Sequence, residues 1–199
     1  MGVAAISVLQ LTDRGQDLAG LGLEEMSFAD AVIRYDPPAG GDAAPVDPSY
    51  LDPSVALGRP SERFVSLGSG GVIELAFVDN VLTNSRDSEP DLYIDEVFGM
   101  AEQFHLAIRP TPDSAGLLRD KLDADGYIKI GSFRGEPSNR HFITLIDLDQ
   151  FLPDLNLRFD AVRITDDQAE GKNDVKQSRT VGMDLTSVGA LSSKCLDCR

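Results

Sequence analysis

The chain of 199 residues has few basic residues, two histidines, two cysteines and no tryptophan. Its 18 Lys and Arg residues stand against 33 Asp and Glu residues, which gives a formal net charge of −15. This imbalance argues against a general nucleic-acid-binding protein, because such a protein needs a basic face to displace counterions from phosphates. It also disfavours docking on anionic lipids. The lack of tryptophan, an aromatic ring suited to stacking on sugars, favours a protein ligand over a carbohydrate ligand.

Long apolar runs are also absent. No stretch approaches the 18 consecutive apolar residues that indicate a membrane-spanning helix, so membrane insertion is not expected. The apolar start, Met1 to Leu9, lacks the positively charged region and the length of a signal peptide. Hydrophobic residues nevertheless make up 42% of the chain, which is too apolar for a disordered acidic tail. The length and composition therefore predict one domain with a substantial core.

The two cysteines, Cys195 and Cys198, both lie in the last five residues. A zinc site needs four ligands, and neither His105 nor His141 has a metal-site spacing to this pair. The position favours a disulfide in the tail, or a link to a segment outside this sequence. A free or metal-binding pair is the alternative.

Several segments carry the apolar, partly alternating pattern of β-strands and are separated by turn residues. In the run from Phe104 to Arg109, a period of two places Phe104, Leu106 and Ile108 on one face. One short helix is expected between Thr111 and Leu122, and an ordered loop from Pro37 to Pro60. The expected strands are 72–78, 92–98, 104–109, 127–133, 142–146, 157–165 and 185–191, with a strand or amphipathic run at 3–11.

This succession of short strands with little helix predicts an all-β protein, namely a β-sandwich. We expect a single domain at 28–193, an N-terminal segment at 1–27 that packs on it, and a tail containing the cysteines at 194–199. The polar stretch from Asp166 to Thr180 is the most mobile segment that the sequence predicts.

Acidic residues gather in three groups along the chain. The first group begins with Asp79 and Asn80 at the end of an expected strand, continues with Asp87 and Asp91 before the next strand, and includes Asp95 and Glu96 within it. The second group contains Asp120, Asp123 and Asp125 before Gly126, and the third pairs Asp166 and Asp167 with Asp184 across the last loop.

The second group can be tested against the EF-hand calcium loop. With Gly126 at the sixth loop position, Lys121 occupies the first position and Ser132 the twelfth, so the first ligand and the bidentate Glu are both missing. The EF-hand therefore fails on spacing. A tight turn at Asp125-Gly126 is the simpler interpretation, because glycine readily adopts a positive φ.

The first group is better placed to bind calcium, which takes six to eight oxygen ligands from carboxylates, amides and carbonyls. If the segment 81–90 is a hairpin connection, Asp79, Asn80, Asp87 and Asp91 lie at neighbouring strand ends. The alternative is that these residues are ordinary strand-end caps exposed to water.

Catalytic motifs are missing: the sequence contains no GxSxG, no P-loop and no HExxH. His105 lies on the face of its expected strand opposite the apolar one, so it is expected to face solvent. We do not expect an enzyme. A carbohydrate-active hydrolase with two facing carboxylates is the less favoured alternative.

Five motifs follow one another along 28–193: Ala56-Leu57-Gly58-Arg59-Pro60, and the segments from Val65 to Asn80, from Pro90 to Val97, from Phe159 to Asp167 and from Val181 to Leu191. Taken in this order, they resemble a family of secreted bacterial cell-surface β-sandwich domains. These domains are found in PEP-CTERM-type exported proteins and beside OmpA-like modules.

The resemblance implies a discoidin-like or galactose-binding-like jelly roll that holds structural calcium and presents loops to glycans or neighbouring proteins. It also implies that the domain is secreted to the cell surface. Two positions depart from the family: Asp95 stands where an aromatic or aliphatic residue is common, and Thr186 where a second Asp is common. Asp95 could add a metal ligand, whereas Thr186 could remove one. The positions that the resemblance singles out for calcium are Asp79, Asn80, Asp91, Glu96 and Asp184.

The sequence thus leads to the hypothesis of an extracellular, calcium-stabilised binding or adhesion module that recognises a surface or matrix protein or a glycan. The alternative is a self-assembling subunit of a ring, layer or fibre, which would form a homo-oligomer. The candidate Ca²⁺ ligands are Asp79, Asn80, Asp87, Asp91, Asp95, Glu96 and Asp184.

Overall fold

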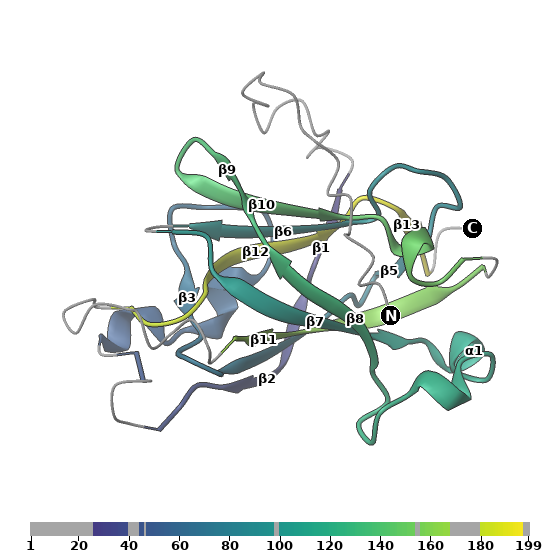
Figure 1. Cartoon of the computed structure of the whole chain (residues 1–199), viewed down its shortest axis with the longest axis horizontal. Helices are drawn as coiled ribbons and strands as arrows, with labels where there is room; N and C mark the ends of the chain where they lie inside the picture. Colours follow the sequence, from purple (N-terminus) through teal and green to yellow (C-terminus); the bar gives the residue numbers. More distant parts are fainter. Residues whose placement is uncertain are drawn as a thin grey trace, which may run out of the picture.

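Two antiparallel β-sheets pack face to face in the computed structural model, which describes residues 26–39, 44–45, 47–97, 100–153, 156–167 and 180–196. The two layers are seen one above the other in Figure 1. The two sheets confirm the expected all-β sandwich with one short helix and long ordered loops. The expected strand at 3–11, the segment 168–179 of the polar stretch, and Cys198 lie outside the described residues.

The first sheet has five strands in a row, with a sixth at the side. The row begins with β1 (Ser27–Phe28) and β12 (Asp184–Ala190), passes through β6 (Leu92–Val97), and ends with β10 (His141–Ile146) and β9 (Glu136–Ser138). Strand β3 (Val65–Ser66) pairs with β12 as well. All these pairings are antiparallel, and apart from the β9–β10 hairpin they join segments that are far apart in the sequence.

The second sheet is built around the long strand β11 (Arg158–Asp166). Strands β4 (Val72–Ala76) and β5 (Asn80–Thr83) pair with successive parts of β11, and β7 (Gln103–Pro110) also pairs with it along almost its whole length. Strands β2 (Ala31–Asp36) and β13 (Ser193–Cys195) pair with β4 and β5, and β8 (Ile128–Arg134) pairs with β7.

The main core lies between the sheets and is formed by alternating side chains of each strand. In β7, Phe104, Leu106 and Ile108 are buried in it, as their period of two predicts. In β6, Leu92 and Ile94 belong to the same core. Glu96 follows Leu92 and Ile94 at a spacing of two residues, so its carboxyl group lies on the core-facing side at the end of β6.

The outer face of β6 is also buried. Tyr93 packs there with Met26 and Ile143 in a second apolar cluster. Asp95 follows on the same face and has an exposed fraction of 0%. A strand that is buried on both faces explains why its sequence does not alternate cleanly between apolar and polar residues.

Helical segments are short. The expected helix between Thr111 and Leu122 reduces to α1 (Pro112–Ala115) and the 3-10 turn η5 (Arg119–Lys121). The expected ordered loop contains two further turns, η3 (Pro48–Tyr50) and η4 (Pro53–Ala56), and η6 (Leu148–Gln150) follows β10. Among the described residues, no helix has the length and apolarity to cross a membrane.

Two glycines carry conformations that their turns require. Gly126 has φ +83° in the turn before β8, which confirms the tight turn predicted at Asp125-Gly126. A Cβ atom on Gly71 would lie 1.8 Å from the carbonyl oxygen of Leu67, so only glycine fits at this close approach.

The sheets reach slightly beyond the expected domain limits. Ser27 pairs with Ala190 in the first sheet, and Lys194 and Cys195 pair with β5 in the second. Cys195 is disulfide-bonded, in keeping with the favoured interpretation of the cysteine pair.

Candidate metal centre

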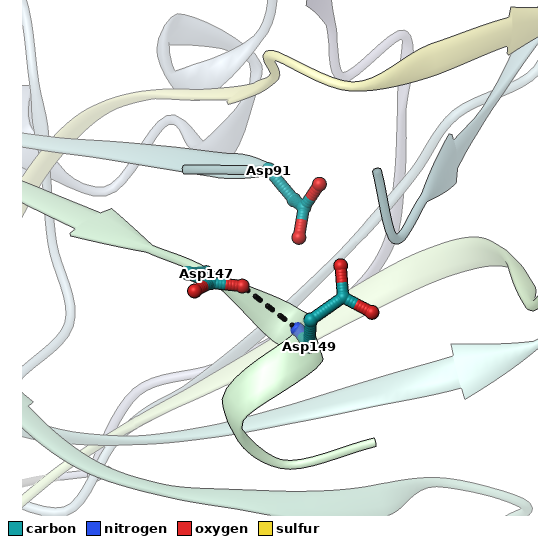
Figure 2. A group of neighbouring side chains, drawn as sticks. All are labelled: Asp91, Asp147 and Asp149. Carbon is teal, nitrogen blue, oxygen red and sulfur yellow. Dashed lines mark hydrogen bonds between the residues drawn. The ribbon is translucent and has the colours of Figure 1, made fainter. Parts of the chain in front are cut away.

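Three aspartates come together beside the start of β6. A carboxylate oxygen of each of Asp91, Asp147 and Asp149 lies within 4.8 Å of the others, and Figure 2 shows the three side chains around one space. The sheet register explains their meeting, because Leu92 of β6 is opposite Ile146 of β10 and the next residue outward on each strand is therefore Asp91 or Asp147. Asp149 follows in the turn η6.

Asp91 is fully buried and holds two loops together. Its carboxylate accepts hydrogen bonds from the backbone N–H of Leu148 at 2.8 Å and of Ser85 at 2.7 Å. Burial raises the pKa of Asp91, the hydrogen bonds from Leu148 and Ser85 oppose this rise, and the nearby charge of Asp149 adds to it. The free-energy cost of keeping Asp91 ionised therefore depends on what neutralises the three aspartates.

Asp147 and Asp149 also hold the same loops through hydrogen bonds. Asp149 accepts hydrogen bonds from the side-chain amide of Asn84 at 2.7 Å and from the backbone N–H of Arg86 at 2.5 Å. Asp147 caps η6 by accepting from the N–H of Asp149 at 2.9 Å. Arg86 has a positive φ of 69°, which an arginine adopts only when its surroundings impose it. The connection 84–91 is thus wrapped around the acidic group.

No cationic side chain neutralises this group within the described part of the chain. None of the described Lys, Arg or His residues forms a salt bridge with Asp91, Asp147 or Asp149. Three hard oxygen donors fit a calcium ion, which would complete its six to eight ligands with backbone carbonyls and water. The donor chemistry therefore suits Ca²⁺.

The expected cluster of Asp79 and Asn80 with Asp91 is not formed. Residues 80–83 form β5 in the second sheet, so the segment 81–90 is not the hairpin connection on which that expectation depended. Asp79 and Asn80 lie at the start of β5 and Asp91 lies beyond its end, and four extended residues span about 13 Å. Of the seven candidate ligands from the sequence, Asp91 is the one that belongs to a close acidic group in the described residues.

Asp87 has a local role in the same connection. Its carboxylate accepts hydrogen bonds from the hydroxyl of Ser85 at 2.9 Å and from the N–H of Glu89 at 2.8 Å. The residue is exposed, and these bonds shape the turn between β5 and β6.

Asp95 lies on the outer face of the first sheet, away from the core-facing residues of β6. One of its oxygens is 2.8 Å from Nδ1 of His141, and the other accepts a hydrogen bond from the Tyr93 hydroxyl at 2.7 Å. Burial raises the pKa of Asp95, and the tyrosine and histidine oppose this rise. Each oxygen of Asp95 is therefore within hydrogen-bond distance of a protein partner.

Glu96 and Asp184 face a different buried environment at the far end of β6. Glu96 accepts a hydrogen bond from the N–H of Glu102 at 3.1 Å, and Asp166 accepts from Gly70 and Met183 at 3.0 and 2.9 Å. Burial raises the pKa of Glu96 to about 9, and the charges of Asp184 and Asp166 contribute to the rise. Within the described residues these three carboxyl groups do not form a close metal-binding group.

Two residues of the second acidic group, Asp123 and Asp125, are neutralised by protein contacts. Asp123 accepts hydrogen bonds from the N–H groups of Asp125 and Tyr127, which forms the turn before β8. Arg163 forms salt bridges with Asp123 and Asp125. The solvent-facing position predicted for His105 is also found: its side chain is 40% exposed, with Nε2 3.8 Å from Asp167.

Sequence reasoning missed Asp147 and Asp149. They lie inside an apolar stretch, so they did not stand out as an acidic cluster. The available signal was the Asp147-Leu148-Asp149 spacing directly after the strand expected at 142–146. Recognising it would have required the antiparallel register of this strand with 92–97, which joins segments about 50 residues apart.

Comparisons with known proteins give no family. No family model matches the chain, and no curated protein matches it significantly. A chain in the X-ray crystal structure of reduced XRCC1 bound to the DNA polymerase beta catalytic domain is similar in path, with a TM-score of 0.49 and 11% sequence identity. The match covers 84% of this chain and 98% of the other. At this score and identity the likeness bears on no functional question.

Proposed function

We propose that this protein is an extracellular binding module whose loops are stabilised by calcium at Asp91, Asp147 and Asp149. The observation that carries the proposal is the convergence of these three carboxylates within 4.8 Å of one another, with no cationic side chain of the described residues paired to them. Leaving three such charges together without a counterion is unfavourable, and a divalent cation relieves their repulsion.

Calcium at this position would fix the connection between β5 and β6 against the turn η6. Asp91 and Asp149 already accept hydrogen bonds from backbone groups of both segments. Neutralising the charges of these aspartates would relieve their repulsion and so stabilise the contact between the two segments. Ligand binding to the folded state alone adds to its stability. The exposed residues of the connection would then be presented as a preformed binding surface.

We favour a surface or matrix protein over a glycan as the partner. Among the described residues, the exposed large hydrophobic side chains include no aromatic ring that could stack on a sugar. Tyr50, an aromatic residue of the long loop, is stacked on Phe64 at 4.6 Å between ring centroids. The disulfide-bonded Cys195 supports an oxidising, extracellular location.

The test is thermal unfolding in calcium and in EDTA at equal ionic strength. Calcium should raise the melting temperature by several degrees, and Asp149→Asn should abolish most of that rise. In EDTA the same variant loses one repelling charge but also one of the two acceptor oxygens that bind Asn84 and Arg86, so the readout is the difference between its melting temperatures in calcium and in EDTA. Asp113→Asn, at an exposed site outside the group, is the matched control and should keep the full response. Equal melting temperatures of the wild type in calcium and EDTA would refute the calcium site.

Partner binding is then measured on the calcium-loaded protein. Binding to matrix proteins that is lost in EDTA supports the proposal, and binding confined to a glycan array would replace the protein partner with a glycan. Light scattering on the same sample examines self-association. A calcium-dependent oligomer that binds neither class of ligand would favour a self-assembling subunit instead.

A further inference from the structure

Asp91 holds a second part of the fold through its main chain. Its carboxylate belongs to the acidic group, whereas its carbonyl oxygen accepts hydrogen bonds from the backbone N–H groups of Leu191 at 2.7 Å and Ser192 at 3.1 Å. Leu191 and Ser192 form the two-residue connection between β12 and β13. One residue therefore joins the candidate calcium site to the connection that leads into β13.

A second route joins the same connection to the acidic group. The carbonyl oxygen of Ser192 accepts from the N–H of Thr83 at 2.9 Å, and the hydroxyl oxygens of these two residues form a hydrogen bond at 2.7 Å. Thr83 ends β5 and is followed by Asn84, whose side-chain amide donates to Asp149 at 2.7 Å. The connection 191–192 is thus held by Asp91 and by the end of β5, which Asn84 links to Asp149.

Strand β13 depends on this connection for its position. It has three residues, of which Ser193 and Lys194 are exposed, and it pairs with β5 at the edge of the second sheet (Figure 1). After the strand, the N–H of Leu196 donates to the carbonyl oxygen of Asp79 at 3.0 Å. A short, exposed edge strand opens at a low free-energy cost, so a change at the connection 191–192 affects how firmly β13 is held.

We propose that calcium at Asp91, Asp147 and Asp149 controls the attachment of β13 to β5, an inference that rests on the proposed function. Without calcium, the carboxylates of Asp91 and Asp149 repel each other across the start of β6 and the turn η6, which loosens both routes to Ser192. Calcium draws these segments together and so fixes the connection 191–192. Because coupling between two binding events is reciprocal, a firmly attached β13 raises the affinity for calcium in turn.

The experiment is amide hydrogen exchange of the full chain, followed by NMR in calcium chloride and in EDTA at equal ionic strength. Calcium should slow exchange about tenfold at the N–H groups of Leu191, Ser192 and Leu196. The N–H of Asp123, which donates to the carbonyl oxygen of Tyr127 in the turn before β8, is the internal control and should keep its rate. The melting temperature is measured in the same two buffers.

The two measurements separate this inference from the calcium site itself. A melting temperature that rises with calcium, while exchange at Leu196 keeps the same rate, would overturn the control of β13 and leave the calcium site standing. The absence of any response in both measurements would remove the calcium site, and the inference with it.

A pair of variants tests the coupling in the opposite direction. Ser192→Ala removes the hydroxyl contact with Thr83 and should weaken calcium binding about threefold, as expected for the loss of one hydrogen bond. Ser193→Ala removes the same group from the exposed neighbouring residue and should leave the affinity unchanged. Isothermal titration calorimetry with calcium chloride measures both, and equal calcium affinities of the two variants would show that β13 and the site are not coupled.

Discussion

Glu96 shows how a single buried carboxyl group can set a pH dependence. Its exposed fraction is 1%, and it has Asp166 and Asp184 as charged neighbours. Burial accounts for most of the rise of its pKa to about 9, from an ordinary value of 4.5. In neutral solution the folded chain therefore holds a proton on Glu96 that the unfolded chain has released.

This difference makes stability fall as the pH rises. Between about pH 5 and pH 9 the folded state binds one more proton than the unfolded state, so the free energy of unfolding decreases by up to about 1.4 kcal/mol per pH unit. Glu96→Gln stays neutral and can still accept from the N–H of Glu102, so it should flatten this decline. Urea denaturation across that pH range measures it, with Asp113→Asn as the control. Parallel curves for wild type and Glu96→Gln would contradict the assignment.

Asp95 is buried like Glu96, but its surroundings differ. Its carboxylate contacts both Tyr93 and His141, so two polar partners replace the water that burial removed. In the sequence, Asp95 stands out as unusual for its position. Its contact with His141 could not be predicted, because strand pairing brings the two residues together across 46 residues. A candidate metal ligand and a satisfied buried carboxylate look alike in sequence.

At the scale of elements, the strands with a clear period of two could be predicted and the pairing could not. Strand β7 follows the alternation of Phe104, Leu106 and Ile108 almost residue for residue. Strand β5 was missed because it has four residues and begins beside Asp79 and Asn80, which are turn formers. Its partners β11 and β13 lie far along the chain, so local pattern does not show them.

The error at β5 also explains the error at the candidate site. Treating 81–90 as one connection places Asp79 and Asp91 at neighbouring strand ends, whereas a strand between them separates the two. Asp91 was still identified, since an Asp before an apolar strand is visible in the sequence. Its partners Asp147 and Asp149 depend on the register of β6 against β10, which is a property of the folded sheet.

The segment between α1 and β8 is held on the second sheet by Tyr127. The ring is 1% exposed, packs on Ala107 and Ala161, and lies 4.4 Å beneath the Arg163 guanidinium. Its hydroxyl donates to Glu74 at 3.1 Å. This one side chain therefore joins a long connection to three strands of the sheet, namely β4, β7 and β11.

Removing the ring should release this connection. We expect Tyr127→Ala to lower the free energy of unfolding by roughly 3–5 kcal/mol, as for other buried aromatic side chains. Trypsin should then cut faster after Arg119 and Lys121, which flank the released turn. Tyr127→Phe keeps the ring and loses the bond to Glu74, at a cost of about 1 kcal/mol. Limited proteolysis with mass spectrometry measures both, and equal cleavage of Tyr127→Ala and wild type would show that the ring does not hold the segment.

For the whole molecule, the acidic residues behind the formal net charge of −15 are of three kinds. Some are paired with arginine, such as Asp123 with Arg163 and Asp160 with Arg109. Others are buried and modified by their surroundings, such as Glu96 and Asp95. The remainder repel one another across the surface, and this repulsion opposes the compact state.

Salt should therefore stabilise the chain even without calcium. Raising sodium chloride in the presence of EDTA screens the surface repulsion, because the Debye length falls from about 30 Å at 0.01 M to about 10 Å at 0.1 M. A gain of about 1 kcal/mol corresponds to a rise of roughly 2–4 °C in the melting temperature for a domain of this size. Differential scanning fluorimetry measures it, and potassium chloride at the same ionic strength should give the same rise, because screening depends on ionic strength and not on the cation used. A melting temperature that is constant or falls with salt would show that the surface carboxylates do not govern the stability of this protein, and that its acidic residues act through local contacts alone.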